Sequence, residues 1–187
     1  MFREFLAREF APYGSLTVKQ IDQLEAHYNL LVLWNNRLNL TRIESLEDAV
    51  RLHYCESLFL GTRLPAGPLR IVDVGSGAGF PGIPIAVLRP DCIVTLVESH
   101  QRKAVFLREA IRTLKNVAVV TDRAENLEPE YDWLVSRAVS PLAVIKLQLA
   151  NNLALLVGSE AIPGFESREP IPWGAGRFLA FHVERSC

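Results

Sequence analysis

The segment from residue 69 to residue 84, LRIVDVGSGAGFPGIP, constrains the fold more than any other part of the chain. Its first six residues are mostly apolar and rich in β-branched side chains, as expected of a central parallel strand covered on both faces. Three glycines follow within five residues. Residues 81–88 then continue as a helix, because proline is tolerated in a first helical turn. A strand, a glycine turn and a helix in this order predict one unit of an α/β sheet.

The remainder of the C-terminal part alternates between strand and helix periodicity. We expect further strands at residues 93–98, 116–121, 131–136, 153–157 and 177–184. A helix is expected after a Ser99 cap, with apolar residues at helical intervals, and another over residues 140–152. Strands that alternate with helices predict a doubly wound, mostly parallel sheet.

The N-terminal part has a helical pattern throughout. Thr17 and Gln20 have capping-box spacing, which predicts a helix that ends near residues 34–37. Ser45, with Asp48 three residues later, predicts a second helix that runs to about residue 60. Residues 61–68 contain two prolines and two glycines and are interpreted as a linker. We therefore expect a helical extension at 1–65 and a core at 66–187, packed as one compact domain.

Composition narrows the class of protein. The chain of 187 residues is 49% hydrophobic, which suits a single packed domain, and its net charge of −1 argues against broad, sequence-independent nucleic-acid binding. Cys55, Cys92 and Cys187 are far apart, and no Cys/His cluster has metal-ligand spacing, so we expect no metal site and a reducing cytoplasm. No apolar run approaches the ~20 residues of a membrane helix. We expect a cytoplasmic monomer without membrane contact.

The spacing of the glycines distinguishes two kinds of nucleotide site. A dinucleotide motif, G-x-G-x-x-G, that begins at Gly75 would need a third glycine where Phe80 stands. The register that begins at Gly77 does match, but it lies far past the strand and contains a proline. The observed D-x-G-x-G-x-G run, with Asp73, Gly75, Gly77 and Gly79, instead favours the loop that binds S-adenosylmethionine.

Two downstream positions agree with a nucleoside ligand. Glu98 ends the next predicted strand, where an acid can accept hydrogen bonds from both ribose hydroxyls. Nicotinamide folds place an acid similarly, so Glu98 alone does not discriminate. Ala124 and Glu125 follow the third strand, where the adenine ring would lie. Asp73 can hold the loop or reach the ligand through water.

The methyl acceptor is narrowed by elimination. Residues 136–141 read SRAVSP, without the Asn-Pro-Pro-aromatic motif of amino-group methylation. No Pro-Cys stands near a strand end to attack cytosine, and acids for metal-dependent catechol chemistry are not clustered. What remains is an acceptor that needs no activation, such as guanine N7, whose lone pair lies in the ring plane. Catalysis would then consist mostly of alignment.

Motifs in order along residues 17–145 resemble the small-subunit ribosomal RNA guanine-N7 methyltransferase G family. They are WNNRLNLT (Trp34–Thr41), His53 with Glu56 and Ser57, VDVGSGAGFPGIP (Val72–Pro84), TLVES (Thr95–Ser99), Lys103 with Phe106 and Leu107, Arg123–Glu125, and SRAV (Ser136–Val139). The resemblance implies a Rossmann-like class I S-adenosylmethionine-dependent methyltransferase fold with seven strands and an N-terminal helical extension. It also implies methyl transfer to guanine N7 in 16S ribosomal RNA, within the small ribosomal subunit or an assembly intermediate.

The resemblance also implies roles for individual residues. Cofactor contacts carry over to a set along the glycine loop and the following strand ends: Asp73, Gly75, Gly77, Gly79, Phe80, Glu98, Ala124, Glu125 and Arg137. Arg137 would lie beside the methyl group and act in catalysis, orienting guanine through O6 or holding its phosphate. Three residues of the extension, Asn39, Thr41 and His53, either line the acceptor side or fasten helices to the core. Arg42, Arg102 and Lys103 form either a basic patch or an ordinary solvated face.

The chain departs from the family pattern near its C-terminal end. The family has a lysine-glycine pair that closes the fifth strand, whereas residues 155–158 read LLVG, and about 20 residues are missing after them. Alternatives to an RNA enzyme are therefore a methyltransferase for a small molecule or protein and a non-catalytic regulator that binds S-adenosylmethionine. A nicotinamide oxidoreductase is disfavoured by the glycine spacing.

Overall fold

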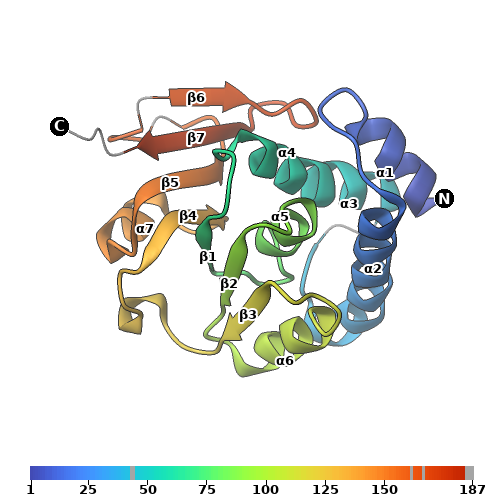
Figure 1. Cartoon of the computed structure of the whole chain (residues 1–187), viewed down its shortest axis with the longest axis horizontal. Coiled ribbons are helices and arrows are strands. Elements are labelled where there is room, and N and C mark those ends of the chain that lie inside the picture. The colour runs from blue at the N-terminus through green and yellow to red at the C-terminus, as the bar shows by residue number, and fades with distance from the viewer. Residues whose placement is uncertain (43–44, 161, 166, 184–187) are drawn as a thin grey trace.

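The computed structural model describes residues 1–42, 45–160, 162–165 and 167–183. A seven-stranded sheet with strand order β3-β2-β1-β4-β5-β7-β6 forms its centre (Figure 1). The strands are β1 (Arg70–Val74), β2 (Ile93–Val97), β3 (Val117–Val120), β4 (Tyr131–Arg137), β5 (Ala150–Val157), β6 (Ser167–Pro170) and β7 (Phe178–Val183). The first five are parallel, and β7 pairs antiparallel with β5 and β6. The order reverses between β1 and β4, the place where open α/β sheets bind ligands.

Helices cover both faces of the sheet. The crossover helices are α5 (Gly82–Leu88), α6 (Gln101–Ala110) and α7 (Pro141–Leu147). Strand β1 divides its side chains between the faces: Ile71 packs with α5 in the larger buried cluster, while Val72 and Val74 pack with Val144 of α7 in the smaller one. This two-sided burial explains why the strand is almost continuously apolar.

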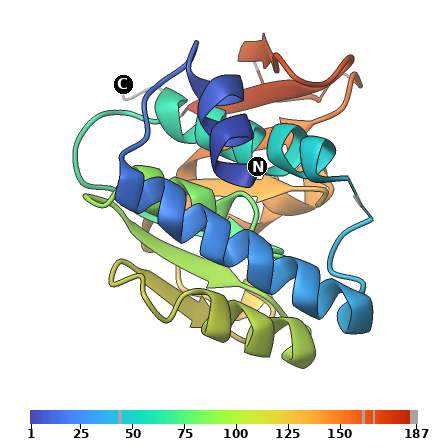
Figure 2. The same ribbon diagram turned by 90° about the vertical axis from the view of Figure 1, so that its right-hand side faces the viewer.

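The N-terminal helices pack on the α5 face. They are α1 (Phe2–Phe10), α2 (Val18–Leu38), α3 (Leu46–Ala49) and α4 (Glu56–Arg63), and Figure 2 shows α2 lying between α1 and α6. Apolar residues of α1, α2 and α4, such as Phe10, Leu24 and Leu58, share one buried cluster with Ile71 of the sheet. The extension is therefore fastened to the sheet by the hydrophobic effect.

Two predicted helix starts in this region are confirmed. The Thr17 side chain accepts a hydrogen bond from the Gln20 N–H, and the Gln20 side chain accepts one from the Thr17 N–H. Ser45 caps α3 by accepting from the Asp48 N–H at 3.0 Å. The helix then continues through a π-helical turn, η1 (Val50–Cys55), into α4. The predicted linker consequently starts later than residue 61, because α4 ends at Arg63.

Two local predictions were wrong, and one strand was missed. Ser99 does not cap α6; His100 is the N-cap residue, and the Glu98 carboxylate accepts its N–H at 2.8 Å. The helix predicted over 140–152 ends at Leu147, because Gln148 adopts a left-handed conformation (φ 50°) and β5 begins two residues later. The edge strand β6 was not predicted, since its sequence SREP has no apolar alternation.

No described helix is long and apolar enough to cross a membrane. The same residues contain no group of three or more His, Cys, Asp or Glu side chains suited to a metal ion. Cys55 and Cys92 are buried free thiols, and Cys187 lies outside the described residues.

Candidate active site

The glycine loop connects β1 to α5 through three residues with positive φ. Gly75, Gly77 and Gly79 have φ values of 72°, 55° and 90°. A Cβ at Gly79 would lie 2.4 Å from Ile83 Cδ1, and one at Gly75 would lie 2.7 Å from Val139 Cγ2. The loop therefore needs glycine for both its backbone conformation and its close packing.

Glu98 fixes the position of this loop from the end of β2. Its side chain is 8% exposed; Oε2 accepts the Gly77 N–H at 3.0 Å, and Oε1 accepts the His100 N–H at 2.8 Å. Each carboxylate oxygen has a further lone pair that can accept another hydrogen bond. Its contact with a ribose remains a prediction.

Asp73 holds the other end of the loop. It is fully buried at the end of β1, and its Oδ2 accepts the Gly82 N–H at 2.9 Å. Its Oδ1 has no hydrogen-bond partner among the described residues. Burial raises the pKa of Asp73 to about 7, because the low-dielectric interior disfavours the charged form. The site thus contains one buried acceptor that remains available to a donor.

Beside the loop is a cavity of about 360 Å³. Gly75, Glu98, Ala124 and Glu125 line it, together with residues of α7. The structure therefore brings together the loop, the acid and the segment after β3, as the sequence predicted. Phe80 does not line the cavity; its side chain is buried, 2% exposed, beneath the loop.

Arg137 leaves the end of β4 and turns towards the N-terminal helices. Its Nη1 donates to the Leu52 carbonyl oxygen at 2.9 Å and to His53 Nδ1 at 2.6 Å. Its guanidinium carbon lies 5.2 Å from the Phe80 ring centroid, within cation–π range. Burial lowers the pKa of Arg137 to about 10, so the side chain is still charged at neutral pH.

His53 connects Arg137 to the extension. Since Nδ1 accepts from Arg137, the ring proton is assigned to Nε2, which donates to Thr41 Oγ1 at 2.7 Å. The ring stacks on Phe80 at 4.7 Å. Burial, with a contribution from the Arg137 charge, lowers the pKa of His53 to about 2. His53 is thus a neutral ring that orients Arg137, and the Thr41–His53–Arg137 chain joins three separate segments.

Two polar residues, His27 and Arg177, escaped sequence reasoning. His27 of α2 donates from Nε2 to the Ala78 carbonyl oxygen at 3.0 Å and accepts at Nδ1 from the Tyr54 hydroxyl at 2.9 Å. Burial lowers the pKa of His27 to about 4. Its place between Leu24 and Leu31 on the buried face of α2 was the available signal. This contact fastens the helical extension directly to the glycine loop.

The second missed residue is Arg177, just before β7. Its Nε and Nη2 donate to Oε1 and Oε2 of Glu56, each at 2.5 Å. The Glu56 side chain is completely buried, and burial raises its pKa although Arg177 opposes the shift. The partners are 121 residues apart, so no local pattern reveals the pair.

The remaining predicted substrate residues lie at the end of α2 and at the start of α6. Asn39 ends α2 in a left-handed conformation (φ 48°), and its N–H donates to the Asn35 carbonyl oxygen. Asn39 is therefore a helix cap. Arg102 and Lys103 lie in the first turn of α6 and make no ion pair within the described ranges.

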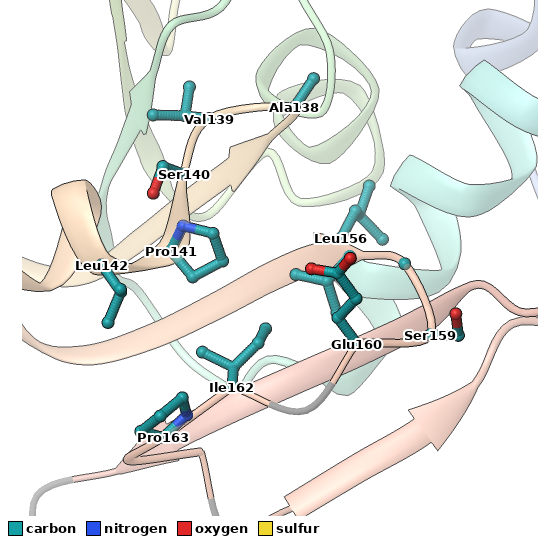
Figure 3. A pocket seen from close by; sticks show the side chains of 12 residues that line it. Ala138, Val139, Ser140, Pro141, Leu142, Leu156, Ser159, Glu160, Ile162 and Pro163 are labelled. Carbon is teal, nitrogen blue, oxygen red and sulfur yellow. The ribbon is translucent and has the colours of Figure 1, made fainter.

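A larger cavity of about 610 Å³ lies at the ends of β4 and β5 (Figure 3). Ala138 to Leu142 line one side, and described residues between Leu156 and Pro163 line the other. Val139 borders both cavities. We assign the nucleoside ligand to the smaller cavity, because the glycine loop and Glu98 line only that one.

The sheet order and the strand-end position of the site are those of the Rossmann-like fold of S-adenosylmethionine-dependent methyltransferases. A solved structure of a SAM-dependent methyltransferase from Aquifex aeolicus aligns with a TM-score of 0.54 at 16% identity, covering 72% of this chain and 91% of that one. At this identity the likeness concerns the fold alone.

Sequence comparison then identifies the family. The profile of rRNA small subunit methyltransferase G matches residues 20–158, and the chain belongs to this family. It is 46% identical over 132 residues to ribosomal RNA small subunit methyltransferase G of Chromobacterium violaceum, covering 68% of this chain and 63% of that protein. The corresponding protein of Chloroflexus aggregans is 34% identical over 176 residues, covering 90% and 73%. The chain thus spans less than two thirds of the Chromobacterium protein.

Proposed function

We propose that this chain binds S-adenosylmethionine in the 360 Å³ cavity and transfers its methyl group to guanine N7 of 16S ribosomal RNA. The observation that carries the proposal is the convergence of the glycine loop, Glu98 and Arg137 at one edge of the sheet, in a member of this family. The substrate form is the small ribosomal subunit or an assembly intermediate, and the protein acts in the cytoplasm as a monomer.

The residues present fit the proposed cofactor. Glu98 offers two oxygens to ribose hydroxyls while it holds the loop. The unpartnered Asp73 Oδ1 suits a donor such as a bound water or the amino group of the methionyl part. Gly75 leaves space where a Cβ would meet Val139. Ala124 and Glu125 would border the adenine.

The cofactor supplies an electrophilic methyl group on a positively charged sulfur. The in-plane lone pair of guanine N7 would be the acceptor of this methyl group. N7 carries no proton, so no side chain needs to remove one. His27 and His53 agree with such a mechanism, since both are neutral and already hydrogen-bonded. The chain's own contribution is therefore alignment.

Arg137 is the residue that we assign to the acceptor side. One of its guanidinium nitrogens is held by Leu52 and His53, and the remaining N–H groups can donate to guanine O6. Its charge survives at neutral pH, because its pKa stays at about 10. Arg137 lines neither cavity, but the next residue, Ala138, lines the 610 Å³ cavity, which shares Val139 with the cofactor cavity and offers space for the base.

The test is methyl transfer from radiolabelled cofactor to undermodified small ribosomal subunits and to the free RNA. We expect label in an alkali-labile guanine, reduced at least tenfold by Arg137→Ala with nearly unchanged cofactor affinity. Arg112→Ala, an exposed arginine paired with Glu109, is the matched control. No transfer to either RNA, with tight cofactor binding, would refute the RNA activity and favour a regulator. Transfer to a protein or small molecule would refute RNA as the methyl acceptor.

A further inference from the structure

The junction of α2 and α6 contains a groove of about 450 Å³ that the proposed reaction does not use. The two helices lie side by side in both views (Figure 1, Figure 2). Six residues line the groove: Leu33, Trp34, Arg37, Leu38, Arg102 and Val105. The floor is apolar and partly open to solvent, since Leu33 is 65% exposed and Val105 is 51% exposed.

Among the described residues, the two arginines of the groove have no carboxylate partner. Elsewhere many arginines are paired with acids, namely Arg3, Arg8, Arg51, Arg63, Arg70, Arg89, Arg112 and Arg177. Within the described part of the chain, neither Arg37 nor Arg102 makes an ion pair, and the groove lining contains no acid. Lys103 follows Arg102 on the same helix and is also unpaired within that part. The groove therefore combines uncompensated positive charge with an aromatic ring.

Trp34 makes this combination specific. Its ring is half-buried and held edge-on to Phe106 of α6, with ring centroids 5.8 Å apart. A nucleotide could stack its base on this partly exposed indole, and its phosphate could bind the two guanidinium groups of the groove. An acidic protein segment would also bind the arginines. The apolar floor and the exposed aromatic ring favour an unpaired nucleotide, because its base can stack on the ring.

The groove also lies close to the candidate site along the chain. Helix α6 begins directly after His100, whose N–H bonds to Glu98. Helix α2 ends at Leu38, and Thr41, which bonds His53 and so supports Arg137, follows within three residues. Each of the two helices that form the groove is therefore followed or preceded in the chain by residues of the candidate site: Thr41 after α2, and Glu98 before α6.

We propose that the α2–α6 groove binds an unpaired nucleotide of the RNA substrate, next to the nucleotide that is methylated. The inference rests on the proposed RNA substrate and adds a second RNA contact that explains how a chain of net charge −1 holds RNA. Such a contact needs only a few unpaired cations at one place, so it does not depend on the net charge of the whole chain.

The experiment measures binding of a fluorescein-labelled single-stranded RNA by anisotropy at several salt concentrations, using the full chain. Arg37→Ala and Arg102→Ala are each expected to weaken binding about fivefold and to reduce the salt slope by roughly 0.7. Trp34→Leu is expected to weaken it about tenfold. Lys19→Ala is the matched control, because Lys19 is an exposed cation of α2 outside the groove. Thermal unfolding and cofactor affinity verify that each variant is folded.

Two further readouts separate this inference from the proposed reaction. RNA that carries 4-thiouridine is expected to crosslink to the peptide that contains Trp34. Loss of crosslinking and of affinity in the arginine variants supports the groove, even if methyl transfer to RNA is never observed. If all three variants bind RNA with the affinity of Lys19→Ala, the groove is not an RNA-binding site, even if methyl transfer proceeds. A protein segment would then be the better occupant.

Discussion

The two sides of the candidate site are constructed differently. On the β1–β2 side, Asp73 and Glu98 hold the glycine loop by accepting backbone N–H groups, and all these residues lie within one βαβ unit. On the β4 side, Arg137 is held by Leu52 and His53, more than eighty positions away. The acceptors that hold the loop thus lie close to it in the chain, although His27 of α2 also bonds the loop at Ala78, whereas the residues that hold Arg137 belong to the extension.

The difference extends to how buried charge is compensated. Glu98 and Asp73 face backbone dipoles that are present whenever the loop is folded. Glu56 depends on Arg177, and Arg137 depends on the uncharged ring of His53. Removal of one partner on the β4 side therefore leaves a buried charged group without its hydrogen bond, which costs more than the loss of an exposed pair.

The largest expected effect concerns the Glu56–Arg177 pair. Arg177→Met should lower the free energy of unfolding by about 3 kcal/mol, the lower end for a buried pair, because the completely buried Glu56 carboxylate loses its partner although Arg177 itself is 37% exposed. Urea unfolding measures this. Arg63→Met is the matched control, since Arg63 also contacts its partner Glu169 through two nitrogens but both side chains are about a third exposed; its loss should cost below about 1 kcal/mol.

The same variant has an expected pH dependence. Burial raises the pKa of Glu56, so the folded state binds a proton more readily than the unfolded state does. The unfolding free energy of Arg177→Met should therefore recover as the pH falls towards that raised pKa. Equal cost for both arginine variants at neutral pH would show that the long-range pair is no more important than a surface pair.

The next effect tests the β1–β2 side. Glu98→Ala should weaken S-adenosylmethionine binding by about 1.5–3 kcal/mol, tenfold or more in Kd, through lost charge-assisted hydrogen bonds. Isothermal titration calorimetry measures it. Glu128→Ala is the control, because Glu128 is an exposed glutamate that does not line the cavity. Unchanged affinity in Glu98→Ala would remove Glu98 from the cofactor site.

The smallest effect concerns the orientation of Arg137. His53→Phe keeps a ring on Phe80 but removes the acceptor for Arg137 Nη1. Single-turnover methyl transfer should slow by about fivefold to tenfold, equivalent to roughly 1 kcal/mol, with cofactor affinity unchanged. Thr41→Val removes only the outer hydrogen bond and should have a weaker effect. If both variants transfer at the normal rate, His53 only fastens the helix.

Sequence patterns predicted most of the fold, because its elements are locally encoded. The alternation of strands and helices and the caps at Thr17 and Ser45 are short-range signals, and the structure confirms them. The exceptions had tertiary causes. The segment predicted as the end of a helix became β5 because it pairs with β4 and β7, and β6 forms only beside β7.

By itself the sequence determined the glycine loop, its acid, the segment after β3 that contains Ala124 and the end of β4 that carries Arg137. A glycine needed for positive φ, or a carboxylate that directly follows a strand, can be read from neighbouring residues. Only the tertiary structure decided that His53 orients Arg137, that Arg177 pairs with Glu56, and that Arg37 and Arg102 share a groove. These contacts join residues far apart in the chain, and burial changes the charge states on which their roles depend.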